Sequence, residues 1–339
     1  MMRHFRLHVV ILIMVVLLAS CAQTPTSPTL TPTPTLSSQA RTYLTAALDI
    51  MQQHSVNRTK INWTALRRQA FAYANGAKTP ADTYAAIQIA LNALGDHHSS
   101  FTSPQQENQL GTGNDTSNLE PPVRRLPYGI GYLELLAFEG SEPAAMQHYV
   151  QSAQDAIRRV DQAGTCGWIV DLRIDNGGNM WPMLAGVGPI LGEGMAGWFV
   201  SPDGVKQAWG YDNGHAQLAG SPAVGIENPY YLKHPDPPVA VLTGRSTASS
   251  GEAIVVAFRG RPRTRSFGEP TYGLPTANEG FKLRDGALLL LTVAVDADRT
   301  GHTYDSAIAP DEFVPSRWGD TTDLGVQTAT TWLHDQEGC

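Results

Sequence analysis

The chain contains 339 residues, of which 42% are hydrophobic and 16% are charged, so it has enough apolar material for one large globular domain or two modest ones. Its formal net charge is −7, and lysine and arginine form no cluster along it. A nucleic-acid-binding function therefore has no support, and we expect no nucleic-acid partner. No internal repeat is visible in the sequence.

The N-terminus has the pattern of a bacterial lipoprotein signal. Arg3 and Arg6 form a basic segment, residues 9–18 are apolar, and Leu-Ala-Ser precedes Cys21 as in a lipobox. We expect residues 1–20 to be a cleaved signal peptide and the Cys21 thiol to be lipidated. An uncleaved anchor helix is the alternative, because the apolar segment is close to the shortest that spans a bilayer. Cleavage predicts an exported protein, lipid-anchored at the outer face of a bacterial membrane in the cell envelope.

The rest of the chain divides by composition into three parts. Residues 21–38 are rich in Thr and Pro and uncharged, which predicts an extended linker without a core. Residues 39–100 have helical periodicity, with Asn62 as a plausible helix cap and Gly95 as a helix stop, so we expect an N-terminal helical bundle. On the face of its first helix we expect Tyr43, Leu44, Ala47, Leu48 and Met51.

Residues 101–339 alternate between apolar strands and helical segments. This alternation predicts an α/β core with a mainly parallel sheet. Residues 194–233, rich in Gly, Asn, Tyr and Trp, predict a β-rich cap insertion whose aromatic side chains either line a groove or form local core. Cys166 and Cys339 can pair in an exported chain, but the position of Cys166 at the start of an apolar strand favours a small buried side chain.

The strongest candidate for chemistry is the stretch from Thr247 to Glu252. It lies between the apolar run 239–242 and a helical segment ending at Phe258. A strand, a turn of small residues and a helix together expose a serine hydroxyl beside backbone N–H groups that can hold an oxyanion. On these six residues alone, the favoured interpretation is an ordinary loop between a strand and a helix, with serines as helix caps.

Further motifs, in the same order along the chain, resemble the tail-specific (C-terminal processing) serine peptidases. The resemblance is to the branch that contains the nisin resistance protein and lacks a PDZ domain. It implies a crotonase-like core, a peptide or protein-tail substrate and Ser249 as the nucleophile. The motifs are Leu94-Gly95-Asp96-His97-His98-Ser99, Asp171-Leu172-Arg173 leading to Gly177-Gly178, Thr247-Ala248-Ser249-Ser250-Gly251-Glu252, and Ala307-Ile308-Ala309-Pro310-Asp311.

The same resemblance identifies His98, rather than His97, as the general base. Members with a Ser-Lys dyad carry lysine where this chain has Leu274, which cannot accept a proton, so the base must come from elsewhere. Because His98 must be neutral to act, activity should fall below pH ~6.5. The sequence does not decide whether a third residue orients His98. The candidate acids are Asp96, Glu252 and Asp305, and a bare Ser-His dyad is equally possible.

A glycine pair after the strand that ends near Asp171 suggests the oxyanion hole. Backbone N–H groups of Gly177 or Gly178 and of Ser250 are the expected donors, although two glycines here are commonly a tight turn. The motif from Asp171 to Gly178 matches the family's Asp-Leu-Arg-x-Asn-x-Gly-Gly except for the order of Asp175 and Asn176. We expect Arg173 to be structural, through a carboxylate such as Asp171.

The sequence thus predicts a membrane-tethered serine endopeptidase that cleaves extended peptides or C-terminal tails through a Ser-His mechanism. If the register is off by one residue, the nucleophile is Ser250. The competing hypothesis is a lipoprotein of the same fold that binds peptides or hydrophobic ligands and hydrolyses nothing. No Cys, His and acidic set has metal-ligand spacing, so we expect neither a metal nor another cofactor.

Overall fold

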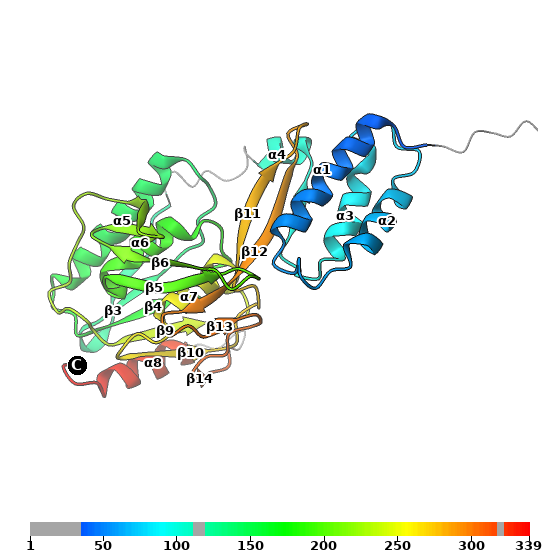
Figure 1. Cartoon of the computed structure of the whole chain (residues 1–339). Helices are drawn as coiled ribbons and strands as arrows, with labels where there is room; N and C mark the ends of the chain where they lie inside the picture. The colour runs from blue at the N-terminus through cyan, green and yellow to red at the C-terminus, as the bar shows by residue number, and fades with distance from the viewer. Residues whose placement is uncertain (1–34, 111–118, 317–321) are drawn as a thin grey trace, which may run out of the picture. The chain divides into compact units, whose positions relative to one another are not determined.

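The computed structural model describes residues 35–110, 119–316 and 322–339. The predicted signal peptide, Cys21 and nearly all of the linker lie outside these residues. Within the described ranges, no helix is both long and apolar enough to cross a membrane. The predicted mixed α/β class is observed, in two sheets with flanking helices (Figure 1).

A six-stranded sheet forms the centre of the core. Its strands pair in parallel except β2 with β3, so the prediction of a mainly parallel sheet holds here. In spatial order they are β14 (Glu312–Phe313), β10 (Thr264–Gly268), β9 (Val239–Thr243), β4 (Gly167–Asp171), β3 (Ile130–Glu134) and β2 (Val123–Arg125). A 3-10 turn, η2 (Pro127–Gly129), precedes β3.

Helices cover both faces of this sheet, which is why its central strands read as unbroken apolar runs. Val170 and Val241 face one cluster, with the helices α5 (Pro143–Asp161), α6 (Met180–Leu191) and α7 (Ser250–Phe258). Ile169 and Ala240 face the other, with α8 (Leu324–His334). The period of two along each strand therefore separates two hydrophobic layers.

The second sheet has eight strands and is antiparallel, which corrects the expectation of a mainly parallel core for the molecule as a whole. Tight turns between consecutive strands make antiparallel pairing the natural outcome. The path runs β1 (Ser100–Thr102), β12 (Leu288–Asp298), β5 (Gly194–Val200), β6 (Lys206–Asp212), β7 (His215–Leu218) and β8 (Ser221–Gly225), with β11 (Thr276–Lys282) and β13 (Thr303–Tyr304) also paired to β12.

The predicted β-rich insertion corresponds to β5–β8, which belong to this sheet through the pairing of β5 with β12. Trp209 and Tyr211 are buried in the hydrophobic core, and Tyr211 packs directly against Gly188 of α6. Of the two readings left open for the aromatic side chains, local core is the correct one for these two residues. Tyr231 is exposed.

The N-terminal helices form the predicted bundle, and Asn62 caps its second helix by accepting from the N–H of Ala65. Their hydrophobic core is completed by the β11–β12 hairpin, which contributes Leu289 and Leu291 from far along the chain. The helices are α1 (Ser38–His54), α2 (Trp63–Tyr73), the 3-10 turn η1 (Ala81–Thr83), α3 (Tyr84–Asn92) and, after β1, α4 (Pro104–Leu110). The buried residues of α1 include all five that the periodicity predicts.

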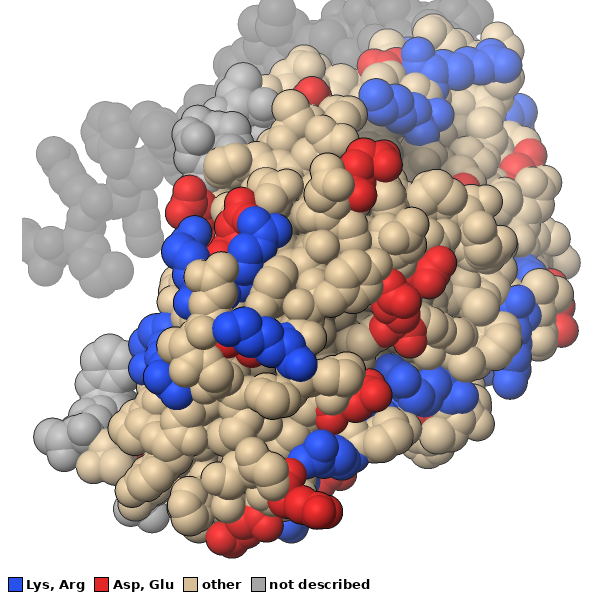
Figure 2. Space-filling view, turned by 90° about the vertical axis from the view of Figure 1, so that its left-hand side faces the viewer, with Lys and Arg blue, Asp and Glu red and all other residues tan. Residues whose placement is uncertain are grey.

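Cys166 and Cys339 form a disulfide, which corrects our preference for an unpaired, buried Cys166. The bond ties the end of the chain after α8 to the start of β4. At the surface, Figure 2 shows acidic and basic side chains interspersed over one face rather than gathered by sign.

Candidate active site

Ser249 lies in the turn between β9 and α7 with φ 53° and ψ −120°. Positive φ is uncommon for a residue with a Cβ, and a serine in this conformation between a strand and a helix matches a nucleophile elbow. The N-terminus of α7 begins at the next residue, so its partial positive charge lies beside the serine.

The buried carboxylate of Glu252 holds this turn in place. It accepts from the backbone N–H of Ser249 at 2.9 Å, and also from the N–H of Gly273, the N–H of Leu274 and the Thr271 hydroxyl, at 2.9, 2.7 and 2.5 Å. Burial raises the pKa of Glu252, and these four hydrogen bonds act in the opposite direction. Glu252 therefore joins the start of α7 to the turn that leads into β11.

The predicted glycine pair is brought against the serine turn. A Cβ on Gly177 would lie 2.9 Å from Cβ of Ser249 and 3.1 Å from the nitrogen of Ser250, so only glycine permits this approach. Among the described residues, no acceptor is found for the N–H of Gly178 or of Ser250, whereas the N–H of Gly177 donates to Oδ1 of Asp175 at 3.0 Å. Two unpaired amides thus flank the serine.

The replacement Gly177→Ala tests this packing. The new methyl would meet the Ala248 carbonyl oxygen and Cβ of Ser249, both at 2.9 Å, and φ of 106° is unfavourable for alanine. We expect labelling of the serine by a fluorophosphonate to slow by about 100-fold or more, the scale of losing an oxyanion donor. Gly164→Ala is the matched control, with φ of 81° and open space around the new methyl. Equal rates for the two variants would contradict the contact.

The hydroxyl of Ser250 is already engaged. It donates to the Gly178 carbonyl oxygen at 2.6 Å, fastening the glycine loop to α7. This bond favours Ser249 over its neighbour as the reactive hydroxyl, because a nucleophile has to give its proton to a base instead.

His98 follows α3 and reaches the same region from the helical bundle. Its Nδ1 lies 2.8 Å from Oγ1 of Thr276, at the start of β11. Among the described residues, no hydrogen bond joins the His98 ring to Ser249; the connection runs through Thr276, the 274–276 turn and Glu252. His97 adopts a positive φ and its side chain is exposed, so the two adjacent histidines differ in environment.

None of the three candidate acids bonds to the His98 ring among the described residues. Asp96 accepts from the backbone N–H groups of His98 and Ser99 and thereby shapes the loop. The Glu252 carboxylate accepts hydrogen bonds within the serine turn and the turn before β11. The Asp305 side chain is exposed, and its carboxylate accepts from the Ser306 hydroxyl. Thr276 takes the position expected for an acid, and sequence reasoning missed it because a threonine at the start of a strand is unremarkable.

Burial lowers the pKa of His98, and the nearby Asp96 charge offsets this only in part. A neutral imidazole is needed for proton acceptance, so inactivation by acid should begin below the ordinary value of about 6.5, at lower pH than the sequence suggests. The pH profile of the fluorophosphonate labelling rate measures this. A half-maximal point above pH 6.5 would contradict the assignment of His98 as base.

A cavity of about 450 Å³ lies between the helical bundle and the core beside these residues. It is lined by Asp96 and His97 from the loop after α3, and by Gly273, Leu274 and Thr276 from the turn before and start of β11. The cavity is also lined by Val200 at the end of β5 and by Ser201 and Pro202 in the turn that follows. Leu274 thus lines space adjoining the His98–Thr276 contact.

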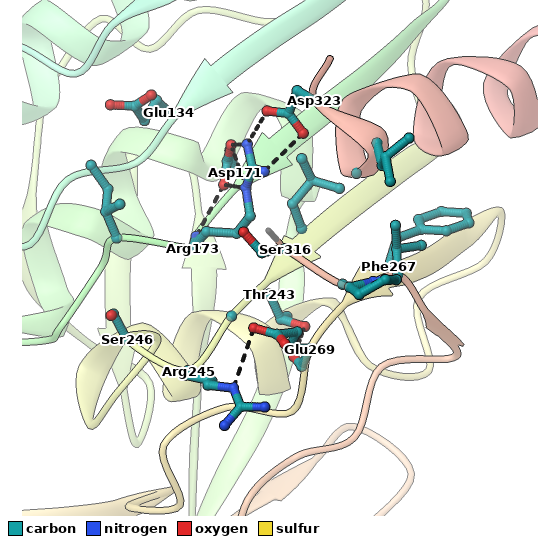
Figure 3. Close-up of a pocket in the computed structure, with 18 of the residues that line it drawn as sticks. Glu134, Asp171, Arg173, Thr243, Arg245, Ser246, Phe267, Glu269, Ser316 and Asp323 are labelled. Carbon is teal, nitrogen blue, oxygen red and sulfur yellow. Dashed lines mark hydrogen bonds and ion pairs between the residues drawn. The ribbon is translucent and has the colours of Figure 1, made fainter. Parts of the chain in front are cut away.

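A second cavity of about 560 Å³ lies at the carboxyl ends of β4, β9 and β10 (Figure 3). In it the Arg173 guanidinium sits between Asp171 and Asp323 and bonds to both, which confirms the structural role expected for Arg173. Arg245 pairs with Glu269 across the same cavity at 3.4 Å. Neither Ser249 nor His98 lines it. No cluster suited to a metal ion occurs in the described ranges.

The family model for peptidase family S41 matches residues 129–314 of the 339. The chain therefore belongs to peptidase family S41, the tail-specific or C-terminal processing peptidases. The match includes the glycine pair and the serine turn but not His98, which comes from the helical bundle before it.

Among known proteins, the chain is similar to the nisin-resistance protein of Lactococcus lactis subsp. lactis, with 27% identity over 270 residues that cover 79% of this chain and 81% of the relative. Its fold is similar to a lipoprotein from Streptococcus agalactiae, with TM-score 0.72 and 26% identity, covering 88% and 97% of the two chains. The photosystem II D1 C-terminal processing protease shares the fold at TM-score 0.61 and 18% identity, covering 86% and 96%.

Proposed function

We propose that this S41 family member is a serine endopeptidase in which Ser249 is the nucleophile and His98 the general base. The observation that carries the proposal is the serine at positive φ beside two unpaired amides, those of Gly178 and Ser250. Leu274 removes the lysine alternative, and the His98 ring reaches the end of the same turn through its contact with Thr276.

In the proposed reaction, His98 takes the proton of Ser249 as the oxygen attacks the scissile carbonyl. In the tautomer that this mechanism requires, Nδ1–H of His98 donates to Oγ1 of Thr276, and Nε2 keeps the lone pair that accepts the proton. The carbonyl oxygen becomes an oxyanion held by the N–H groups of Gly178 and Ser250. His98 then protonates the departing amine, and water hydrolyses the acyl-enzyme by the same steps in reverse order.

In the part of the chain that the structure describes, no hydrogen bond joins the His98 ring to the Ser249 hydroxyl. Catalytic hydrogen bonds are often long in substrate-free enzymes and shorten when substrate binds. We infer that the His98 loop, fixed by Asp96 to Thr292 of β12, approaches the serine when a peptide occupies the adjoining cavity.

The substrate we infer is an extended peptide or a protein C-terminal tail. The cavity between bundle and core offers a place to hold such a segment, since it adjoins the proposed site and is lined from both sides. We also propose a crotonase-like arrangement for the six-stranded sheet with α5–α7, because repeated parallel strand–helix units build it.

We propose further that the protein is exported and tethered by acyl chains on Cys21. The support is the lipobox pattern in the sequence and the similarity to a solved structure described as a lipoprotein. The linker of residues 21–38 then holds the folded part away from the bilayer.

The second candidate function is a binding protein that hydrolyses nothing. It is favoured by the contact of the His98 ring with Thr276 rather than with Ser249, and by similarity to a protein whose name states resistance to nisin rather than an enzymatic activity. In that case the cavity beside His97 and Leu274 holds a peptide or hydrophobic ligand without cleaving it.

A fluorophosphonate probe separates the two candidates. The enzyme predicts covalent labelling of one serine, mapped by mass spectrometry to Ser249, and strong slowing in His98→Ala. His97→Ala is the matched control for the adjacent histidine and should label at nearly the normal rate. Absence of labelling across pH 5–9 in folded protein would favour the binding protein. A label on Ser250 would mean that the nucleophile is Ser250 rather than Ser249.

A further inference from the structure

Asp175 is a fully buried carboxyl placed between the two halves of the proposed site. Its side chain has no exposure to solvent, and it follows β4 in the loop that leads to the glycine pair. Its Oδ1 accepts from the Gly177 N–H at 3.0 Å, and its backbone oxygen accepts from the Ala248 N–H at 3.0 Å. A single residue therefore fastens the glycine loop and the serine turn together.

The carboxyl itself touches the first turn of α7. A Cβ on Gly251 would lie 3.0 Å from Cγ and 3.1 Å from Oδ1 of Asp175. The second oxygen, Oδ2, is buried and has no hydrogen-bond partner among the described residues. Burying an ionised carboxylate with one oxygen unpaired costs far more free energy than burying the neutral acid, so the site favours the neutral form.

We propose that Asp175 is a positioning residue that holds the Gly177–Gly178 loop in its neutral, protonated form, and that its ionisation at rising pH switches the site off. The inference rests on the proposed function, since it concerns the oxyanion hole of that reaction. A negative charge on the carboxyl that accepts from Gly177, the residue before the Gly178 donor, would oppose the negative charge that develops on the substrate oxygen.

The surroundings support a neutral carboxyl near pH 7. Burial raises the pKa of Asp175 to about 7, and the Gly177 N–H opposes this rise. Among the described groups near it, none is an unpaired cation: Tyr149 on α5 donates to the Leu136 carbonyl, and Glu252 on α7 is engaged by four donors. In its own loop, Arg173 is paired with Asp171 and Asp323.

One other buried carboxyl near the site has to be distinguished from it. Asp296 of β12 is fully buried next to Glu252, Oδ1 of Asp296 is unpaired, and burial followed by the Glu252 charge raises its pKa to about 8. It does not bond to the glycine loop, so its ionisation should leave the oxyanion donors in place. Asp296→Asn is therefore the matched control.

The experiment compares fluorophosphonate labelling rates of the full chain, Asp175→Asn, Asp175→Ala and Asp296→Asn from pH 5 to 9. For the unmodified protein we expect the rate to fall at least tenfold between pH 6.5 and 9. Asp175→Asn keeps the oxygen that accepts from Gly177 but cannot ionise, so it should keep the rate at pH 6.5 within about threefold and lose the alkaline fall. Asp175→Ala should label slowly at every pH.

An alkaline fall that persists in Asp175→Asn, or that disappears only in Asp296→Asn, would overturn the inference. The melting temperature supplies a readout that needs no activity. An acid with a raised pKa in the folded state loses its stabilising contribution as pH rises towards that pKa. Asp175→Asn should thus gain more in melting temperature, relative to the unmodified protein, at pH 8.5 than at pH 5.5.

The two readouts separate failure of the proposed function from failure of this inference. If Ser249 is never labelled in the unmodified protein, the peptidase proposal falls, whereas the melting comparison still decides whether Asp175 titrates. An equal gain at both pH values would show that the carboxyl is not neutral in the folded protein, and the proposed switch would then be wrong.

Discussion

Ser249→Ala should lower the turnover of a cleavable peptide by about 10⁶-fold, the scale seen when a serine peptidase loses its nucleophile. The methyl group cannot attack a carbonyl. The residual catalysis then comes only from substrate binding and from the backbone amides of Gly178 and Ser250. Fluorophosphonate labelling should disappear altogether. The measurement is the initial rate on a quenched fluorescent peptide, with the labelling gel beside it.

Ser250→Ala is the matched control for this variant. It removes the hydrogen bond to the Gly178 carbonyl, worth about 1 kcal/mol, so we expect a rate within about tenfold of normal. The melting temperatures of both variants should stay close to that of the unmodified protein, since neither serine is in the hydrophobic core. A larger loss in Ser250→Ala than in Ser249→Ala would mean that the nucleophile is misassigned.

The local elements of the fold follow from the sequence, because periodicity and capping act over a few residues. The apolar run at 239–242 is β9, and the inward residues expected for α1 are all buried. The cap at Asn62 and the pairing of Arg173 with Asp171 are confirmed for the same reason: each is decided by neighbours within three residues. The turn around Ser249 likewise could be placed between a strand and a helix.

The long-range arrangement could not be predicted from those local patterns. Residues 288–298 form one strand, and its apolar run does not reveal that Leu289 and Leu291 complete the core of the helical bundle. The boundary expected at residue 100 therefore separates parts that share a core. The antiparallel sheet depends on the same strand, because both the N-terminal β1 and the later β5 pair with it.

The candidate site divides in the same way. The resemblance to the family pointed to Ser249, to Gly177 or Gly178, and to His98, whereas the contact between His98 and Thr276 joins residues 178 positions apart in the sequence. Thr276 carries no motif, and the three acids considered for its role were chosen by chemical type alone. The disulfide between Cys166 and Cys339 is a further case, because pairing depends on where the chain end lies after α8.

Glu252→Ala should give the largest loss of stability among the variants of the site. The substitution leaves four donors, from Ser249, Thr271, Gly273 and Leu274, without their acceptor in a buried place. Each unpaired buried donor costs about 1–3 kcal/mol, and partial access of water reduces the sum, so we expect about 3–5 kcal/mol in urea unfolding.

Activity should fall further than stability explains. The bond from the Ser249 N–H to Glu252 helps to hold the serine at positive φ, and the bond from Leu274 fixes the turn that leads to Thr276 and His98. Labelling measured well below the unfolding temperature, on protein that is still folded, should therefore be at least about 100-fold slower. Glu252→Gln keeps the shape of the side chain, but its NH₂ group faces backbone N–H donors. We therefore expect its labelling rate and stability to lie between those of Glu252→Ala and those of the unmodified protein.

Glu269→Gln is the matched control, since Glu269 is also shielded from solvent but pairs with a largely exposed Arg245. An ion pair of that kind contributes at most about 1 kcal/mol, so its loss should leave both unfolding and labelling nearly unchanged. If Glu252→Gln labelled at the normal rate with an unchanged unfolding midpoint, the hydrogen bonds of Glu252 would not position the serine. The geometry of the turn would then have to come from the packing of Gly177 against it.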